Sequence, residues 1–302
     1  MTICFFHNQK AFLPEIGAYR QLFEPKGITC KTALPQEADR MDTDVEWHFM
    51  GTDTHKQKEG RIKIHEYGSG SIAPFRTWKD FGKKLLNVKP DFRLFLNQYV
   101  NERFAFNDGV PFGYRDMGVG AEWLVQTGPP PAVYKYDFVY TGDLSSAREP
   151  EKLLNVFTNF MKDKTLLVIS NQYARLQALY RSSANIIFKG PYEHPVIRSM
   201  LPEARYGINY IVDKEPFNRQ TSTKFLEYAA CGLPVVSTQY RWIEEFRSTC
   251  GGRYYYLNQD LSNFRWHDIE NFNFSPPDLS GWTWEKQIER SGVLEFLFSR
   301  LP

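Results

Sequence analysis

The segment from Asn218 to Thr238, NRQTSTKFLEYAACGLPVVST, holds the residues of this chain that are best suited to bind an anion. Ser222 and Thr223 can cap the start of a helix, where free backbone N–H groups and the helix dipole favour negative charge. Lys224 adds a cation there, and Glu227 follows three residues later on the same helix face. The spacing places phosphate donors one turn from a carboxylate that can accept sugar hydroxyls, as a nucleotide diphosphate requires. The alternative is an exposed ion pair between Lys224 and Glu227, which would contribute about 0.3 kcal/mol.

The elements around this segment predict a parallel α/β domain. Gly232 and Pro234 end the helix, and apolar strand-like runs alternate with helix-like runs through the second half of the chain. Strands are expected at 136–140, 166–169, 185–190, 206–212, 234–237 and 254–257, and helices from about 149 and at 175–181, 196–204 and 242–246. We therefore expect one complete Rossmann-like domain over residues 131–280.

The first half of the chain has a similar but less regular pattern. Strands are expected at 3–6, 28–32, 45–50, 62–66 and 92–98. Pro129, Pro130 and Pro131 cannot lie inside a helix or a central strand, so they predict a stiff connector after a first domain of residues 1–130. Open α/β sheets bind ligands at the carboxyl ends of their strands, so loops of both domains would line a shared cleft.

The run TSTKFLEYAACGLPVVST resembles the donor-binding helix of the large retaining nucleotide-sugar glycosyltransferase family with the GT-B architecture. The relevant subgroup reads roughly S-P-x-K-x-x-E-Y-x-A-x-G-x-P-V-V. The matching positions are Lys224, Glu227, Tyr228, Ala230, Gly232, Pro234, Val235 and Val236. The resemblance implies two Rossmann-like domains that face each other across a cleft, with the glutamate at position 227 on the donor's ribose hydroxyls and the preceding turn on its diphosphate. Many members carry a second glutamate eight residues earlier that contacts the sugar. Here that position is Arg219, so the sugar contacts must differ.

Three further residues are candidates for the donor site. Gly142 lets the chain pass close to a phosphate, and Arg148 could reach it with a bidentate fork, as the resemblance also implies. The alternative is that Ser145 or Ser146 caps the next helix and Arg148 is solvated. Gly190, with Tyr192 after a later strand, could lie against the base.

A catalytic residue is harder to identify. The resemblance implies that the acceptor attacks on the face from which the nucleotide leaves, so that positioning and charge neutralisation replace a general base. Polar residues at strand ends of the first domain are the candidates: His7, Asn8, Asp53, His55, His65 and Glu66. We select His65, because family members often place a polar residue or histidine on a matching loop that touches the donor sugar or its phosphate. The alternative is a structural histidine.

One acidic pair could suggest a metal. Asp42-Thr43-Asp44 is a D-x-D sequence, the metal–nucleotide motif of the other main glycosyltransferase architecture. Here it precedes a strand instead of following one, in the half opposite the donor segment, so we interpret it as a solvated turn. We predict no metal and no other cofactor besides the nucleotide-sugar substrate.

The composition limits which binding partners and which cellular compartment are expected. The 302 residues are 42% hydrophobic, and 37 basic against 35 acidic residues give a net charge of +2, so no overall field argues for nucleic acid as a partner. The four cysteines lack metal spacing, and the N-terminus lacks the pattern of a signal peptide, which predicts a cytoplasmic protein with reduced thiols. The resemblance implies that the helix in residues 281–302 packs back toward the first domain. The alternative is an amphipathic helix on a membrane surface, with Lys286, Arg290 and Arg300 as its cations.

The sequence thus predicts a retaining, metal-independent glycosyltransferase that moves a hexosyl or deoxyhexosyl group from a nucleotide-diphosphate sugar to a saccharide or lipid-linked saccharide acceptor. The subgroup resemblance suggests bacterial capsule or lipopolysaccharide synthesis, with peripheral association at the inner face of the plasma membrane. The alternatives are a catalytically silent nucleotide-sugar or glycan-binding protein, and a GT-B epimerase or phosphorylase. A dehydrogenase is disfavoured, because no G-x-G-x-x-G sequence follows a strand.

Overall fold

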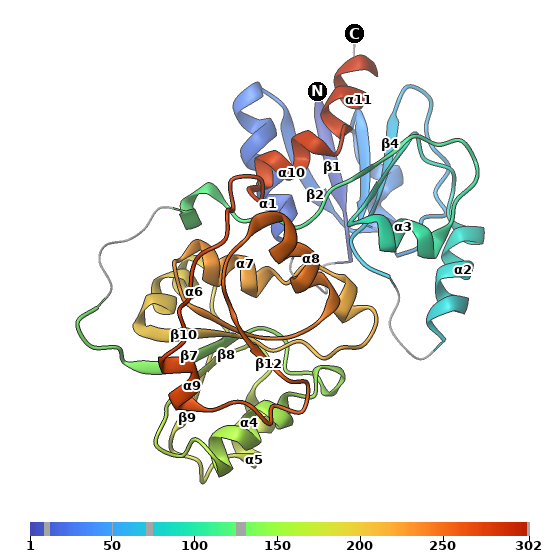
Figure 1. Ribbon diagram of the computed structural model, residues 1–302. Coiled ribbons are helices and arrows are strands. Elements are labelled where there is room, and N and C mark those ends of the chain that lie inside the picture. Colours follow the sequence, from blue (N-terminus) through green and yellow to red (C-terminus); the bar gives the residue numbers. More distant parts are fainter. Residues whose placement is uncertain (9–12, 50, 71–74, 125–130, 301–302) are drawn as a thin grey trace. The chain divides into compact units, whose positions relative to one another are not determined.

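The computed structural model describes residues 1–8, 13–49, 51–70, 75–124 and 131–300 (Figure 1). The chain divides into two compact units. The first comprises Met1–Gly118 together with Trp282–Pro302, and the second comprises Val119–Gly281. Each unit is built on its own six-stranded parallel sheet.

The sheet of the first unit has the strand order β2-β1-β3-β4-β5-β6. Its strands are β1 (Thr2–Phe6), β2 (Thr29–Ala33), β3 (Val45–Phe49), β4 (Ile62–Tyr67), β5 (Phe92–Phe95) and β6 (Phe112–Tyr114). Its helices are α1 (Pro14–Phe23), α2 (Arg76–Leu86), α3 (Gln98–Phe104), α10 (Trp284–Arg290) and α11 (Val293–Arg300), with short 3-10 turns at Glu24–Lys26 and Pro35–Arg40.

The C-terminal helices complete the core of the first unit. Ile288, Val293 and Leu297 are fully buried in one cluster with Phe5 and Trp47 of the sheet. The alternative of a C-terminal helix lying on a membrane therefore does not fit, because these three apolar side chains already pack inside the protein. Among the described residues, no helix combines the length and the apolar character needed to cross a membrane.

Two details of the first unit differ from the expected strands. The strand expected at 92–98 ends at Phe95, because the side chain of Asn97 accepts a 3.1 Å hydrogen bond from the Val100 N–H and starts α3. The short edge strand β6 was not predicted. It pairs with β5 in parallel, although both of its aromatic residues, Phe112 and Tyr114, are exposed.

The sheet of the second unit has the order β12-β11-β10-β7-β8-β9. Its strands are β7 (Tyr136–Thr141), β8 (Leu166–Ile169), β9 (Ile186–Lys189), β10 (Ala204–Asn209), β11 (Val235–Thr238) and β12 (Tyr255–Leu257). Its helices are α4 (Pro150–Asn159), α5 (Ala174–Leu179), α6 (His194–Met200), α7 (Thr223–Ala230), α8 (Arg241–Cys250) and α9 (Trp266–Glu270), with 3-10 turns at Ala121–Leu124, Ser146–Arg148, Leu201–Glu203 and Phe217–Arg219.

The elements expected in this half are present with shifted ends. The helix expected at 196–204 stops at Met200, because Pro202 lies in the 3-10 turn that follows and Ala204 already begins β10. The strand expected at 206–212 ends at Asn209, after which the Ile211 N–H donates to the Thr238 hydroxyl instead of to a strand.

The border between the units also differs from the expected one. The second unit begins at Val119, so residues 119–130 of the first predicted domain belong to it. The turn Ala121–Leu124 lies against α7, and Trp123 is buried there, which explains the assignment. Pro129 and Pro130 of the predicted connector lie outside the described residues.

Candidate functional site

The carboxyl end of β7 and the start of α7 meet in the second unit. Gly142 directly follows β7 and has a φ of +124°, which favours glycine. A Cβ on Gly142 would lie 3.7 Å from the Nζ atom of Lys224. The same Nζ lies 4.1 Å from the centroid of the Tyr140 ring. The structure therefore brings together two of the predicted site residues, Gly142 and Lys224, and adds Tyr140, which the sequence did not single out.

A buried hydrogen-bond network fixes the first turn of α7. Ser222 is the N-cap, and its hydroxyl accepts from the Phe225 N–H at 3.4 Å and donates to the Asn209 side chain at 2.6 Å. The amide of Asn209 in turn donates to Ser237 at 2.9 Å and to Tyr240 at 3.2 Å. The ends of β10 and β11 thus hold the N-terminus of α7, including the half-buried Thr223, in place.

Tyr228 joins the other face of α7 to the sheet. Its hydroxyl accepts a 2.7 Å hydrogen bond from the Thr141 N–H, and its ring is fully buried. A Cβ on Gly207 of β10 would lie 2.6 Å from this ring, so only glycine lets the helix approach this closely. The position of α7, and with it the position of Lys224, is therefore set by packing.

Burial shifts the pKa values of both Lys224 and Glu227 on α7 in the direction that favours their neutral forms. It lowers the pKa of Lys224 to about 7, an effect that the positive charge of Arg148 increases. It raises the pKa of Glu227 to about 8, although the attraction of Lys224 opposes this rise. The Glu227 side chain is only 14% exposed, and its Oε1 lies 3.5 Å from Nδ1 of His194 on α6. The alternative of a solvent-exposed Lys224–Glu227 pair is therefore wrong. A ligand that brings negative charge to Lys224 would stabilise its charged form.

Arg148 lies beside these groups and is not solvated as the alternative required. Its guanidinium carbon lies 3.8 Å from the centroid of the Phe217 ring, and its Nε lies 4.0 Å from Oδ2 of Asp143. Burial lowers its pKa. The following helix α4 starts at Pro150 without a serine cap, and the Ser145 hydroxyl donates to Asp143 instead.

Gly190 lies in the connection between β9 and α6. It has a φ of +126°, and a Cβ there would lie 2.3 Å from the carbonyl oxygen of Ser170. The chain then passes through Pro191 and the partly exposed Tyr192 to His194, which contacts Glu227. His194 was not predicted. Its contact with Glu227 joins two helices far apart in sequence, and the only local signal is Pro195 at the start of α6.

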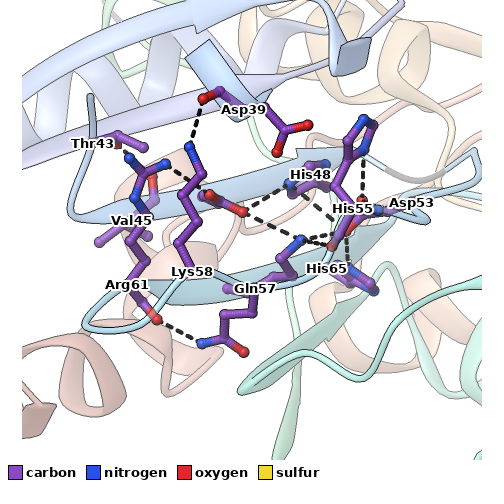
Figure 2. Close-up of polar contacts among 12 residues, drawn as sticks. Asp39, Thr43, Val45, His48, Asp53, His55, Gln57, Lys58, Arg61 and His65 are labelled. Atoms are coloured by element: carbon purple, nitrogen blue, oxygen red, sulfur yellow. Dashed lines mark hydrogen bonds and ion pairs between the residues drawn. The ribbon is translucent and has the colours of Figure 1, made fainter. Parts of the chain in front are cut away.

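His65 does not fit the predicted contact with a donor sugar, because its side chain is fully buried. It belongs to β4 of the first unit, where its Nε2 lies 3.0 Å from Oδ2 of Asp53 (Figure 2). Lys63 donates to the same Asp53 oxygen at 2.9 Å, and the half-exposed His55 lies 3.3 Å from the other oxygen. Burial lowers the pKa of His65 to about 4. The network of these four side chains holds the loop after β3 onto the sheet.

The D-x-D sequence forms a turn at the start of β3. Asp42 and Asp44 are exposed, and the side chain of Asp44 accepts from the Thr2 N–H at 2.7 Å. Thr43 is buried and donates to the carbonyl of Thr2. Within the described ranges, no three His, Cys, Asp or Glu side chains are placed to hold a metal ion together.

Comparison with known proteins gives a fold relationship only. No family model matches the sequence, and no curated protein matches it. Among solved structures, an alpha-glucosyltransferase in complex with UDP-glucose and DNA containing an abasic site has a TM-score of 0.57 at 11% identity, covering 99% of this chain and 92% of that one. A structure described as trehalose-6-phosphate from E. coli bound with UDP-2-fluoro glucose has a TM-score of 0.61 at 9% identity, covering 100% and 96%. A trehalose-6-phosphate synthase studied for glycosyl transfer with retention has a TM-score of 0.60 at 8% identity, covering 99% and 95%. Together with the two parallel six-stranded sheets, these likenesses over nearly the whole chain show that the protein has the α/β GT-B fold.

Proposed function

We propose that the protein is a retaining glycosyltransferase that uses a nucleotide-diphosphate sugar, with a UDP-sugar as the first candidate donor. The observation that carries the proposal is the start of α7, where Lys224 lies beside Gly142 and Glu227 lies one turn further along. The fold supports it, because structurally similar proteins are described with UDP-glucose and UDP-2-fluoro glucose.

Each donor-site residue has a defined role in this proposal. The free N–H groups at the start of α7 and the ammonium of Lys224 bind the diphosphate, and Gly142 leaves room for it. Arg148 adds a second cation nearby. Glu227, held by His194, accepts hydrogen bonds from the ribose hydroxyls. Gly190 and Tyr192 precede His194 at the position proposed for the base.

Transfer then depends on electrostatics and positioning. The acceptor hydroxyl attacks the anomeric carbon, the bond from that carbon to the diphosphate oxygen breaks, and the acceptor proton passes to the departing diphosphate. Lys224, Arg148 and the α7 amides stabilise the charge that develops on the leaving group. Because these groups supply the neutralisation, we propose that transfer needs no metal ion. His65 has no direct part, because it is buried in the first unit.

The acceptor is proposed as a saccharide or a lipid-linked saccharide, and a surface polysaccharide such as capsule or lipopolysaccharide is the proposed product. This part rests on the resemblance of the α7 segment to its subgroup. It also predicts an intracellular protein that works at the inner face of the plasma membrane.

Ligand-induced stabilisation tests the donor site. Thermal melts with UDP, GDP, ADP and CDP should show an increase in Tm for one nucleotide, because a ligand that binds only the folded state stabilises it by mass action. Glu227→Ala should fold but lose this increase. Glu245→Ala, an exposed glutamate on α8, is the matched control and should keep it. Equal shifts in both variants would remove Glu227 from the site.

Turnover assays distinguish a glycosyltransferase from the alternative functions. Release of nucleoside diphosphate that requires a saccharide acceptor, with retention at the anomeric carbon by NMR and no loss in EDTA, would support the proposal. Interconversion of the donor without an acceptor would indicate an epimerase. Binding without turnover would indicate a silent binding protein, which Arg219 at the position of the usual second glutamate favours.

A further inference from the structure

Helix α2 in the first unit exposes apolar residues and buries Asp80. Four of these apolar residues, beginning with the N-cap Phe75, recur every three or four positions, and Leu86 adjoins the last of them. Together they form what we call the α2 apolar face: Phe75 (73% exposed), Trp78 (73%), Phe81 (52%), Leu85 (67%) and Leu86 (61%). The rings of Trp78 and Phe81 pack edge to face at 6.4 Å, so the face is continuous. Apolar side chains gathered on a surface in this way indicate an interaction site.

The orientation of α2 is fixed by contacts on its inner side. Asp80 is only 3% exposed and accepts two hydrogen bonds from Arg103 of α3, one of them from Nε at 2.9 Å. Lys84 donates to the carbonyl of Ala105, directly after α3. Figure 1 shows α2 and α3 side by side. Turning the apolar face inward would break this ion pair and bury a charge without its partner, so the face stays exposed.

The sequence of α2 is basic. Basic residues outnumber the single acid in the α2 sequence RTWKDFGKKLL, and that acid, Asp80, is already paired with Arg103. Lys83 and Lys84 lie in the last turn, and Lys89 follows in the next loop. The whole chain carries a net charge of only +2, so this is a local concentration of cations.

Trp, Phe and Leu on the exposed side of a helix of basic sequence match the boundary between lipid head groups and acyl chains. The rings and leucines enter the apolar layer, while lysine ammonium groups reach the anionic head groups. A second copy of this chain fits less well, because a symmetric contact between two α2 faces would bring the same lysines together. The C-terminal helices offer no such face from Ile288, Val293 and Leu297, which are buried in the core.

We propose that the α2 apolar face docks the protein on the surface of a bilayer that contains anionic lipids, with α2 lying in the plane of the interface. The proposal rests on the membrane location included in the proposed function and names the surface that would provide it. Its test is separate from that of the donor site, because binding to vesicles needs no nucleotide sugar and the residues concerned lie in the first unit.

Vesicle co-sedimentation tests it. The full chain should bind vesicles of phosphatidylcholine with phosphatidylglycerol, bind phosphatidylcholine alone weakly, and lose binding as salt rises. Trp78→Gln with Phe81→Gln should weaken binding by about tenfold or more, because it removes two aromatic anchors. The matched control is Phe160→Gln, which changes an 81% exposed phenylalanine in the second unit and should leave binding unchanged.

Both variants alter exposed side chains, so their melting temperatures should match that of the unchanged protein, which excludes misfolding as the cause. Absence of binding to anionic vesicles would overturn the proposal, as would unchanged binding of the double variant. Sedimentation velocity gives the third outcome. A dimer that the double variant abolishes, without vesicle binding, would assign the face to a second copy of the chain and not to lipid.

Discussion

The imidazole of His194 lies 3.5 Å from the carboxyl of Glu227, measured from Nδ1 to Oε1. This contact joins the first residue of α6 to the middle of α7, and so links the loop after β9 to the helix that follows β10. Glu227 is therefore positioned from two sides, by its own helix and by a histidine from a neighbouring one.

Replacement of His194 should weaken nucleotide binding less than replacement of Glu227. We expect His194→Ala to reduce affinity for the nucleoside diphosphate severalfold, because the carboxyl loses a positioning partner but still reaches the ribose. Isothermal titration calorimetry of both single variants and the double variant measures the coupling, which should be about 0.5–3 kcal/mol for two residues in contact. Additive losses would show that the two side chains act separately.

Nucleotide affinity should fall as the pH rises above neutrality. Burial lowers the pKa of Lys224 to about 7, so the free protein loses this cation above that pH, while a bound diphosphate favours the charged form. The affinity supplied by the ammonium is therefore fully present below pH 7 and is lost as the pH rises toward the pKa of the complex. The slope should approach about one log unit in affinity per pH unit.

Calorimetry in buffers of different ionisation enthalpy should also detect proton uptake on binding above pH 7. Lys224→Met removes one titrating group and should give weaker binding with a smaller slope, because Glu227, whose pKa burial raises to about 8, still loses its proton in this range. A slope unchanged in the variant would assign the titration to residues other than Lys224.

Loss of the Tyr228 hydroxyl should destabilise the second unit. Tyr228→Phe removes the acceptor of the buried Thr141 N–H and leaves that donor unpaired, which should cost about 1–3 kcal/mol in the free energy of unfolding. Urea unfolding measures the change. Tyr192→Phe, at a partly exposed tyrosine, is the matched control and should change stability by less than about 0.5 kcal/mol.

His65 should make the first unit sensitive to mild acid. Burial lowers its pKa from 6.5 to about 4, so between these values the unfolded chain binds a proton that the folded chain does not. Its contribution to stability is present above pH 6.5 and is lost as the pH falls toward 4, by up to about 1.4 kcal/mol per pH unit.

His65→Gln removes the titration and keeps a side chain that can donate to Asp53, so its stability should change less over this range. Chemical unfolding at a series of pH values measures the difference, and His267→Gln, at an exposed histidine, should behave like the unchanged protein. A loss of turnover in His65→Gln without any change in stability or in its pH dependence would restore a direct role for His65.

The α7 segment could be predicted from sequence because its signals are local. Ser222 caps the helix, Gly232 and Pro234 follow its end, and the spacing from Lys224 to Glu227 fixes which face they share. The strands other than the exposed edge strand β6 were also evident, since buried parallel strands appear as short apolar runs between turn residues.

The contacts of the candidate site could not be predicted in the same way. Asn209 and His194 reach α7 from other elements, and nothing in their own neighbourhood indicates these partners. His65 stands on a strand of mixed polarity, IKIHEY, which suggests one exposed face. The structure buries both faces, because Asp53 from the loop after β3 covers the polar one.

The second unit is inserted into the chain of the first, since residues 119–281 separate the N-terminal sheet from α10 and α11. During synthesis, the ribosome must therefore deliver all of the second unit before Ile288, Val293 and Leu297 can enter the core that they complete. Until then the apolar residues of the first unit that pack against these three side chains stay exposed, which favours aggregation of the incomplete chain.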